Sequence, residues 1–275
     1  MGAKRQLGSF ETATFLAKNP VFTLGELRRA LGNRGSRRAA SERVKYHLKR
    51  GRLKAVARGV YASVPPGVEP ARFKPDRFLV AAAVRPDAVF SHHSALELIG
   101  AAHSDWNVCS AFSGSRHAPL GVDGVKLLFL LDPPALRNAP SRHLGARKAG
   151  RQGKTLWTTG PERTLLDGFR QPRLAGGLAE LVESARGFGV LDLALVSKLL
   201  GVYKQKILYA AVGWFLETTR RQFSVPESLL ENLEKKRPRS PHYLPRGERR
   251  GGVLVARWNL VLPEEIVRGR EPDEA

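Results

Sequence analysis

The 275-residue chain is strongly basic, with 46 lysines and arginines against 25 acidic residues and a net charge of +21. So large an excess of positive charge indicates a polyanionic partner, and nucleic acid fits it better than an anionic membrane surface does. A hydrophobic content of 42% is enough for one large or two ordinary domains, and the single cysteine, Cys109, excludes an intrachain disulfide and a multi-cysteine zinc site.

The sequence offers no clear membrane-spanning or secretory segment. The longest apolar runs, 127–131 and 207–216, are too short to cross a bilayer. Residues 1–8 are not followed by an apolar stretch of signal-peptide length. We therefore expect a cytoplasmic protein with no membrane partner.

The chain begins with two predicted helices. Apolar residues at helical spacing predict a first helix of about three turns that ends before Asn19-Pro20. Thr23 and Glu26 have the spacing of a capping box. A second helix therefore begins there, and Gly32 ends it.

A third helix is predicted between Ser36, its N-cap, and Gly51, which ends it in a left-handed conformation. Ala40, Val44 and Leu48 form one apolar stripe along it. The lysine and arginine side chains of this helix therefore lie on its other faces.

A β-hairpin follows, because polar and apolar residues alternate on both sides of Arg58-Gly59. A basic helix followed by a hairpin is the outline of a winged helix. Residues 36–64 contain nine lysines and arginines but only one acid, Glu42. Core packing does not require so many charged side chains, and the exposed face of an ordinary domain carries both positive and negative charges. The composition of this stretch therefore favours nucleic-acid binding.

We predict that this stretch binds duplex DNA. Side chains that the apolar stripe turns outward are expected to enter the major groove, while Lys54 and Arg58 on the wing are expected to contact phosphates or the minor groove. The full predicted DNA-binding set is Arg37, Arg38, Ser41, Arg43, Lys45, Tyr46, Lys49, Arg50, Arg52, Lys54, Arg58 and Tyr61.

Prolines between positions 65 and 75 interrupt every periodic pattern and predict a domain boundary. We assign residues 1–66 to a winged helix-turn-helix DNA-binding domain and residues 67–275 to a larger mixed α+β domain. Its helices are expected to begin after three N-caps (Asp76, Ser94 and Thr159) and to recur at 178–185, 191–200, 204–216 and 226–236. Its strands are expected at 107–112, 125–131, 155–158, 253–256 and 258–262, with a basic loop at 137–154.

Three places in the chain resemble a known family. They are LKRGRLKAVARGVYA at 48–62, FSHHSALELIG at 90–100, and the pairing of PERTLLD at 161–167 with WNLVLP at 258–263. In these stretches the chain resembles the AbiEi antitoxins, which are transcriptional regulators of type IV toxin-antitoxin systems.

The resemblance implies an N-terminal winged helix that binds inverted repeats in its own promoter. It also implies a C-terminal domain that antagonises a nucleotidyltransferase-like toxin without a stable complex. A repressor and antitoxin of this kind is not an enzyme and needs no catalytic residue, metal or cofactor. The unusually basic stretches 37–58 and 142–154 depart from the family and leave RNA binding open.

Two histidines invite a metal-site interpretation. His93 and Glu97 stand one helical turn apart, next to His92. We prefer histidines satisfied in the core, since metal sites draw convergent ligands from fixed spacings.

Two further patterns suggest an enzyme. Glu162 and Asp167 could form a nuclease acid pair, but an ion pair of Arg163 with Asp167, four residues apart, is favoured. The tripeptide at 153–155 matches only the tail of a phosphate-binding loop and is interpreted as a chance match. A nuclease-like nucleic-acid-processing enzyme or an RNA-binding protein is the alternative function.

Overall fold

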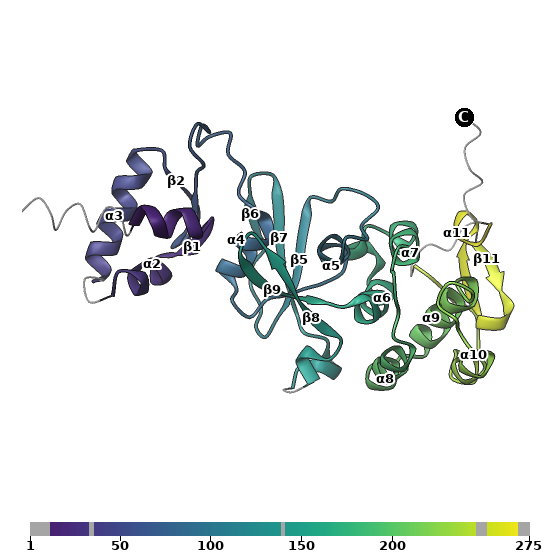
Figure 1. Ribbon diagram of the computed structural model, residues 1–275. Helices are drawn as coiled ribbons and strands as arrows, with labels where there is room; N and C mark the ends of the chain where they lie inside the picture. The colour runs from purple at the N-terminus through teal and green to yellow at the C-terminus, as the bar shows by residue number, and fades with distance from the viewer. Residues whose placement is uncertain (1–11, 33–35, 139–140, 246–251, 269–275) are drawn as a thin grey trace, which may run out of the picture.

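The computed structural model describes residues 12–32, 36–138, 141–245 and 252–268. In Figure 1 a small N-terminal unit, a six-stranded sheet, a group of helices and a second small sheet follow one another along the molecule in chain order. The chain is therefore a mixed α+β protein, as expected. Within the described ranges, none of the helices combines the length and apolar character that crossing a lipid bilayer requires.

The described part of the N-terminal unit contains three α-helices and a three-stranded antiparallel sheet of order β1-β3-β2. Its elements are a helix at 12–18, β1 (Val21–Thr23), α2 (Leu24–Ala30), α3 (Arg37–Lys49), β2 (Leu53–Ala57) and β3 (Val60–Ser63). The predicted capping box is confirmed, because Thr23 Oγ1 accepts from the Glu26 amide at 3.1 Å and the Glu26 carboxylate accepts from the Thr23 amide at 2.7 Å.

The predicted limits of α3 are confirmed as well. Ser36 Oγ accepts from the Ala39 amide at 3.0 Å, and Gly51 has a φ of 63° after the last turn. The buried stripe differs in one member, because His47 is buried with Ala40 and Val44 while Leu48 is only half-buried. In β2 a bulge between Ala55 and Ala57 shifts the register with β3, and Ala55 is exposed.

The six-stranded sheet has the order β6-β7-β5-β4-β9-β8. The β5/β7 and β4/β9 pairs are parallel and the other pairs antiparallel. Its strands and the helices between them are α4 (Arg77–Val84), β4 (Val89–Phe90), α5 (His93–Ile99), β5 (Val108–Ser113), β6 (Leu120–Val122), β7 (Val125–Leu131), β8 (Ala146–Arg151) and β9 (Lys154–Thr159).

Three local predictions in this region were wrong. Part of the expected loop at 137–154 is the edge strand β8, which forms a hairpin with β9. Ser94 does not cap α5, because its hydroxyl accepts from the Ser110 amide at 2.8 Å and the helix begins at His93. Thr159 does not cap α6 (Pro161–Arg170) either, because the N-cap is Gly160, and Glu162 in the first turn accepts from the Asp192 amide at 2.9 Å.

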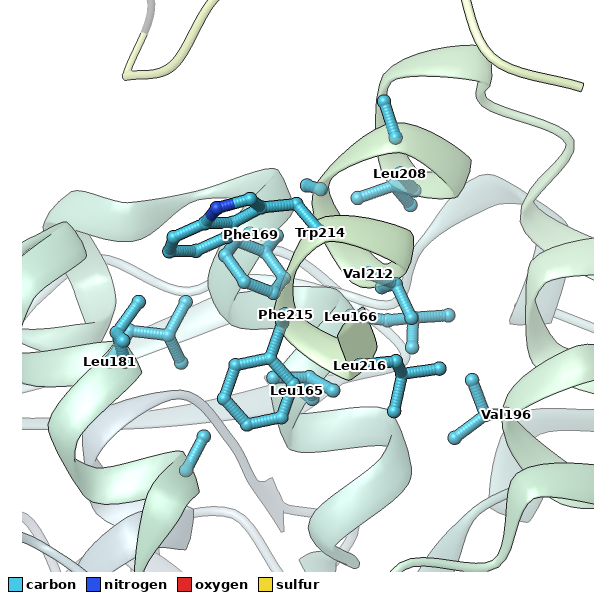
Figure 2. Packing of buried hydrophobic residues seen from close by; sticks show 14 of the residues in the cluster. Leu165, Leu166, Phe169, Leu181, Val196, Leu208, Val212, Trp214, Phe215 and Leu216 are labelled. Carbon is cyan, nitrogen blue, oxygen red and sulfur yellow. The ribbon is translucent and has the colours of Figure 1, made fainter. Parts of the chain in front are cut away.

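The C-terminal half packs around α9 (Lys206–Thr218), which is buried along most of its length. Figure 2 shows Leu165, Leu166 and Phe169 of α6 against Val212, Phe215 and Leu216 of α9. The surrounding elements are α7 (Leu178–Arg186), α8 (Leu193–Tyr203), α10 (Glu227–Glu234), α11 (Glu264–Arg268) and a sheet of β10 (His242–Tyr243), β12 (Leu260–Pro263) and β11 (Gly252–Val255).

Trp258 joins this second sheet to α9. It was predicted within a strand, but it lies in a short 3-10 helix, Ala256–Trp258, and is fully buried. Its Nε1 donates to Glu217 Oε2 at 2.6 Å, and its ring lies directly on Gly213. A Cβ added to Gly213 would stand 2.1 Å from the ring, so this position of α9 requires glycine.

Gly213→Ala should therefore lower the free energy of unfolding by about 3 kcal/mol, since neither the helix backbone nor the indole can move aside. Gly201→Ala in α8 is the matched control, because nothing lies within 4 Å of its added Cβ. The control should be neutral or stabilising by up to about 1 kcal/mol. Urea denaturation of both variants measures the difference, and equal stabilities would contradict the packing described.

Buried polar groups lie between the sheet and these helices. The predicted ion pair is confirmed, with Arg163 Nε 3.3 Å from Asp167 Oδ2 and both side chains fully buried. His92 and His93 are fully buried, as predicted, and His93 Nδ1 lies 2.9 Å from Glu97 Oε1. His92 has a φ of 54°, and burial lowers its pKa to about 4.

The unfolded chain binds a proton at His92 near pH 6.5 whereas the folded chain resists it until about pH 4. The free energy of unfolding should therefore fall as the pH drops from 6.5 towards 4, by about 3 kcal/mol from this residue. His92→Asn keeps a polar atom near Ser91 but cannot titrate. Its stability should depend less steeply on pH in this window, whereas parallel curves would show that His92 is not the group responsible.

The N-terminal unit is docked on the rest of the chain. Val21, Val60 and Ala62 of its sheet belong to the same apolar cluster as Phe78 and Leu79 of α4. The assignment of 1–66 and 67–275 to separate domains stays a prediction, and a cut between them would expose both sides of this cluster.

Candidate nucleic-acid interface

The outward side of α3 is the most basic exposed helix face of the N-terminal unit. Because Ala40, Val44 and His47 point inward, the opposite side carries exposed charges. Its exposed members are Arg37, Arg38, Lys45, Tyr46, Lys49 and Arg50, and Ser41 and Arg43 are half-buried. In Figure 1, α3 lies at the end of the molecule away from the six-stranded sheet, so the rest of the described chain leaves this side open.

The contacts on this face leave its charge largely unneutralised. Lys45 Nζ lies 3.0 Å from Glu42 Oε1, but both side chains are well exposed, and such surface pairs contribute about 0 to 1 kcal/mol. The Arg50 guanidinium lies 5.0 Å from the centre of the Tyr46 ring, a cation–π contact. This stacking leaves the edges of the guanidinium free to donate hydrogen bonds.

Three arginines from different elements converge beside α3. Arg28 of α2, Arg37 of α3 and Arg58 of the β2–β3 turn line one hollow of about 430 Å³. The turn is held there because the Leu24 amide donates to the Gly59 carbonyl at 2.9 Å. Arginine side chains around one hollow can bind a phosphate oxygen from several directions.

Arg28 was not among the predicted residues. The signal for it was present, since its neighbour Leu27 is buried and Arg28 falls on the exposed side of α2. What the sequence does not reveal is that α2 brings this arginine next to Arg37 and Arg58.

Two residues that were predicted to contact DNA make contacts within the protein instead. Lys54 Nζ donates to Asp123 Oδ1 at 2.6 Å and to the Phe73 carbonyl at 2.7 Å, with its side chain only 19% exposed. Tyr61 is half-buried and packs beside the Phe22 ring. Arg52 is exposed but follows the C-terminal end of α3. The candidate interface therefore gains Arg28 and loses Lys54 and Tyr61.

The enzyme-like patterns have structural roles. Gly153 occupies the β8–β9 turn, and Lys154 Nζ donates to Asn19 Oδ1 at 2.6 Å, so the partial phosphate-loop match links the sheet to the N-terminal unit. Asp167 accepts from the Tyr203 hydroxyl at 2.7 Å in addition to its arginine. Across 12–32, 36–138, 141–245 and 252–268, no three His, Cys, Asp or Glu side chains are grouped so that they could hold a metal ion.

No protein-family model and no curated protein sequence matches the chain. Among solved structures, the chain is similar to the crystal structure of the RV2827C protein from Mycobacterium tuberculosis, with a TM-score of 0.57 over 92% of this chain and 90% of that one. The two sequences are 17% identical, so the likeness concerns the fold alone.

Arg28→Ala and Arg58→Ala should each weaken binding to a random-sequence DNA duplex. Each substitution removes one phosphate contact, so the slope of log affinity against log salt concentration should decrease by about 1. Arg221→Ala removes the same charge from an exposed position beyond α9 and should change neither quantity. Fluorescence anisotropy over a salt series measures both, and three identical slopes would exclude the arginine hollow from the interface.

Proposed function

We propose that the N-terminal unit is a winged helix that binds duplex DNA, and that the protein is a sequence-specific transcriptional repressor. The observation that supports this most directly is the exposed basic side of α3, which is followed at once by the β2–β3 hairpin. Its thirteen residues make α3 about 20 Å long, a length suited to the major groove.

The contacts divide into two kinds. Arg38 and Ser41 lie in the first turns of α3, the part of a recognition helix that reaches base edges, and Arg37 beside them also lines the arginine hollow. Arg28 and Arg58 flank them and bind phosphates, which fixes the position of the helix without reading sequence.

We further propose that this repressor is the antitoxin of a type IV toxin-antitoxin pair. The resemblance to the AbiEi antitoxins supports this, and it implies binding to inverted repeats in the protein's own promoter and antagonism of a nucleotidyltransferase-like toxin. Two of the resembling stretches supply fully buried residues, His92 and His93 in one and Arg163 and Asp167 in the other. These motifs hold the fold, so toxin antagonism depends on surface residues outside them.

RNA binding is the second candidate, and one contact favours it. Lys148 of the edge strand β8 lies over the ring of Trp157, which also contacts the His143 ring, with centroids 4.5 Å apart. Aromatic rings beside basic side chains can stack unpaired bases. Competition between promoter duplex and structured RNA separates this function from the first, and a nuclease assay with divalent metal tests the enzyme alternative.

Arg38→Ala should relax the sequence preference of the protein. Affinity for the promoter repeat should fall by about 1 to 3 kcal/mol while affinity for random duplex changes far less, because a base contact is lost. Electrophoretic mobility shifts on both duplexes measure the ratio. Equal losses on the two would assign Arg38 to phosphate contacts.

The Arg38→Ala variant also tests whether repression and toxin antagonism depend on different parts of the chain. Cells that express a cognate nucleotidyltransferase-like toxin should still be protected by Arg38→Ala, because the proposed antagonism belongs to the C-terminal part of the chain. Failure of the wild-type protein to protect such cells would refute the antitoxin proposal and leave the repressor proposal standing.

A further inference from the structure

A second hollow lies at the other end of α3 and is not used by the proposed DNA contacts of Arg37 and Arg38. Its volume is about 860 Å³. The helix at 12–18, the C-terminal end of α3 and the segment 63–70 after β3 line it. This size falls within the range of small-molecule sites, about 300 to 1,000 Å³.

The walls of this hollow are mostly apolar. Leu16 and Ala17 face it from the first helix, and prolines 65, 66 and 70 face it from the segment after β3. Val68 in the same segment also lines the hollow and is 41% exposed. A flat hydrocarbon body would shield these surfaces from water.

The polar side chains that line the hollow belong to His47, Arg50, Arg52 and Ser63, and none of these four is acidic. Arg50 and Arg52 stand at its edge and are exposed. His47 lines it from α3, is 9% exposed, and its Nδ1 has no hydrogen-bond partner among the described residues. Burial, Arg52 and Arg43 lower the pKa of His47, so at neutral pH the ring is uncharged and can form one further hydrogen bond.

We propose that this hollow binds a small organic anion with a flat apolar body and one carboxylate. The carboxylate pairs with Arg50 and Arg52, the body lies against Leu16 and the prolines, and a hydrogen bond to the ligand satisfies the buried His47 nitrogen. Inorganic phosphate would leave the apolar walls uncovered, and a neutral hydrocarbon would leave the histidine unpaired.

The test uses 2-naphthoate and its neutral analogue 2-naphthalenemethanol, which share the ring system and differ in charge. Both are titrated into the full-length protein without DNA, followed by calorimetry and by NMR of the His47 imidazole. Naphthoate should bind one site per chain, shift the His47 signals, and bind about tenfold more tightly than the alcohol.

Two variants locate the binding. Ala17→Phe fills the hollow and should abolish binding, whereas Ala30→Phe at an exposed position of α2 should not. Arg52→Ala removes one exposed cation and should weaken naphthoate, but not the alcohol, about fivefold. Equal binding of both compounds, binding that survives both Ala17→Phe and Arg52→Ala, or unshifted His47 signals would each overturn the proposal.

A bound carboxylate would also neutralise Arg50, which belongs to the candidate nucleic-acid interface, so naphthoate should lower the affinity for duplex DNA. This consequence rests on the proposed function. Because the titration contains no DNA, a protein that binds naphthoate but not DNA would refute the repressor proposal alone.

Discussion

The larger part of the molecule is arranged around the contacts of one buried group, the guanidinium of Arg163. It pairs with Asp167 at 3.3 Å, donates to the carbonyl oxygens of Arg142 at 2.7 Å and Leu144 at 3.3 Å, and lies over the Phe112 ring. A charge removed from water must be paired and hydrogen-bonded, so moving α6 away from these partners would leave the guanidinium buried without compensation. The side chain thereby fixes the position of the helices on the six-stranded sheet.

A second constraint fixes the N-terminal unit on that sheet. The apolar cluster between β1, β3 and α4 excludes water, and two lysines close its edges, Lys54 with Asp123 and Lys154 with Asn19. Both lysines lie in basic stretches that by composition alone belong to a nucleic-acid surface. Here they join two parts of the chain, so α3 is held in a defined orientation relative to the six-stranded sheet instead of moving on a free linker.

Local signals in the sequence were reliable where the structure depends on local chemistry. The caps at Thr23, Ser36 and Asp76 are present because each requires only a side-chain oxygen and an amide two or three residues away. Predictions failed where a distant partner decides the outcome. Glu162 makes no capping contact at the start of α6 because its carboxylate accepts a hydrogen bond from the distant Asp192 amide. A strand as short as Val89–Phe90 exists only because neighbouring strands flank it on both sides.

The candidate interface follows the same rule. The exposed side of α3 could be predicted from its apolar stripe, since the period of a helix determines which residues face outward. The loss of Lys54 and the gain of Arg28 could not, because each depends on an element remote in sequence: the β6–β7 turn that carries Asp123 in one case, and the β2–β3 turn that carries Arg58 in the other. Whether a basic residue meets a partner protein atom or remains free is a property of the tertiary fold.

The distribution of paired charge is the physical reason to locate the proposed nucleic-acid interface on α3 rather than on the basic chain as a whole. Near the C-terminus Arg257 is enclosed by three carboxylates, with Glu217 and Glu227 at 2.6 Å and Glu234 at 3.0 Å. Hydrogen bonds to Glu227, and then to Glu217 and Glu234, raise the pKa of Arg257. The positive charge of Arg257 is therefore neutralised by carboxylates of the same chain. On α3 the single acid, Glu42, meets one lysine at the surface, and no carboxylate in the part of the chain that the structure describes pairs with the arginines of this helix. Like charges held side by side repel one another and disfavour the folded unit unless an external anion neutralises them, and a row of phosphates spaced along a groove is the anion whose geometry matches a row of side chains along a helix.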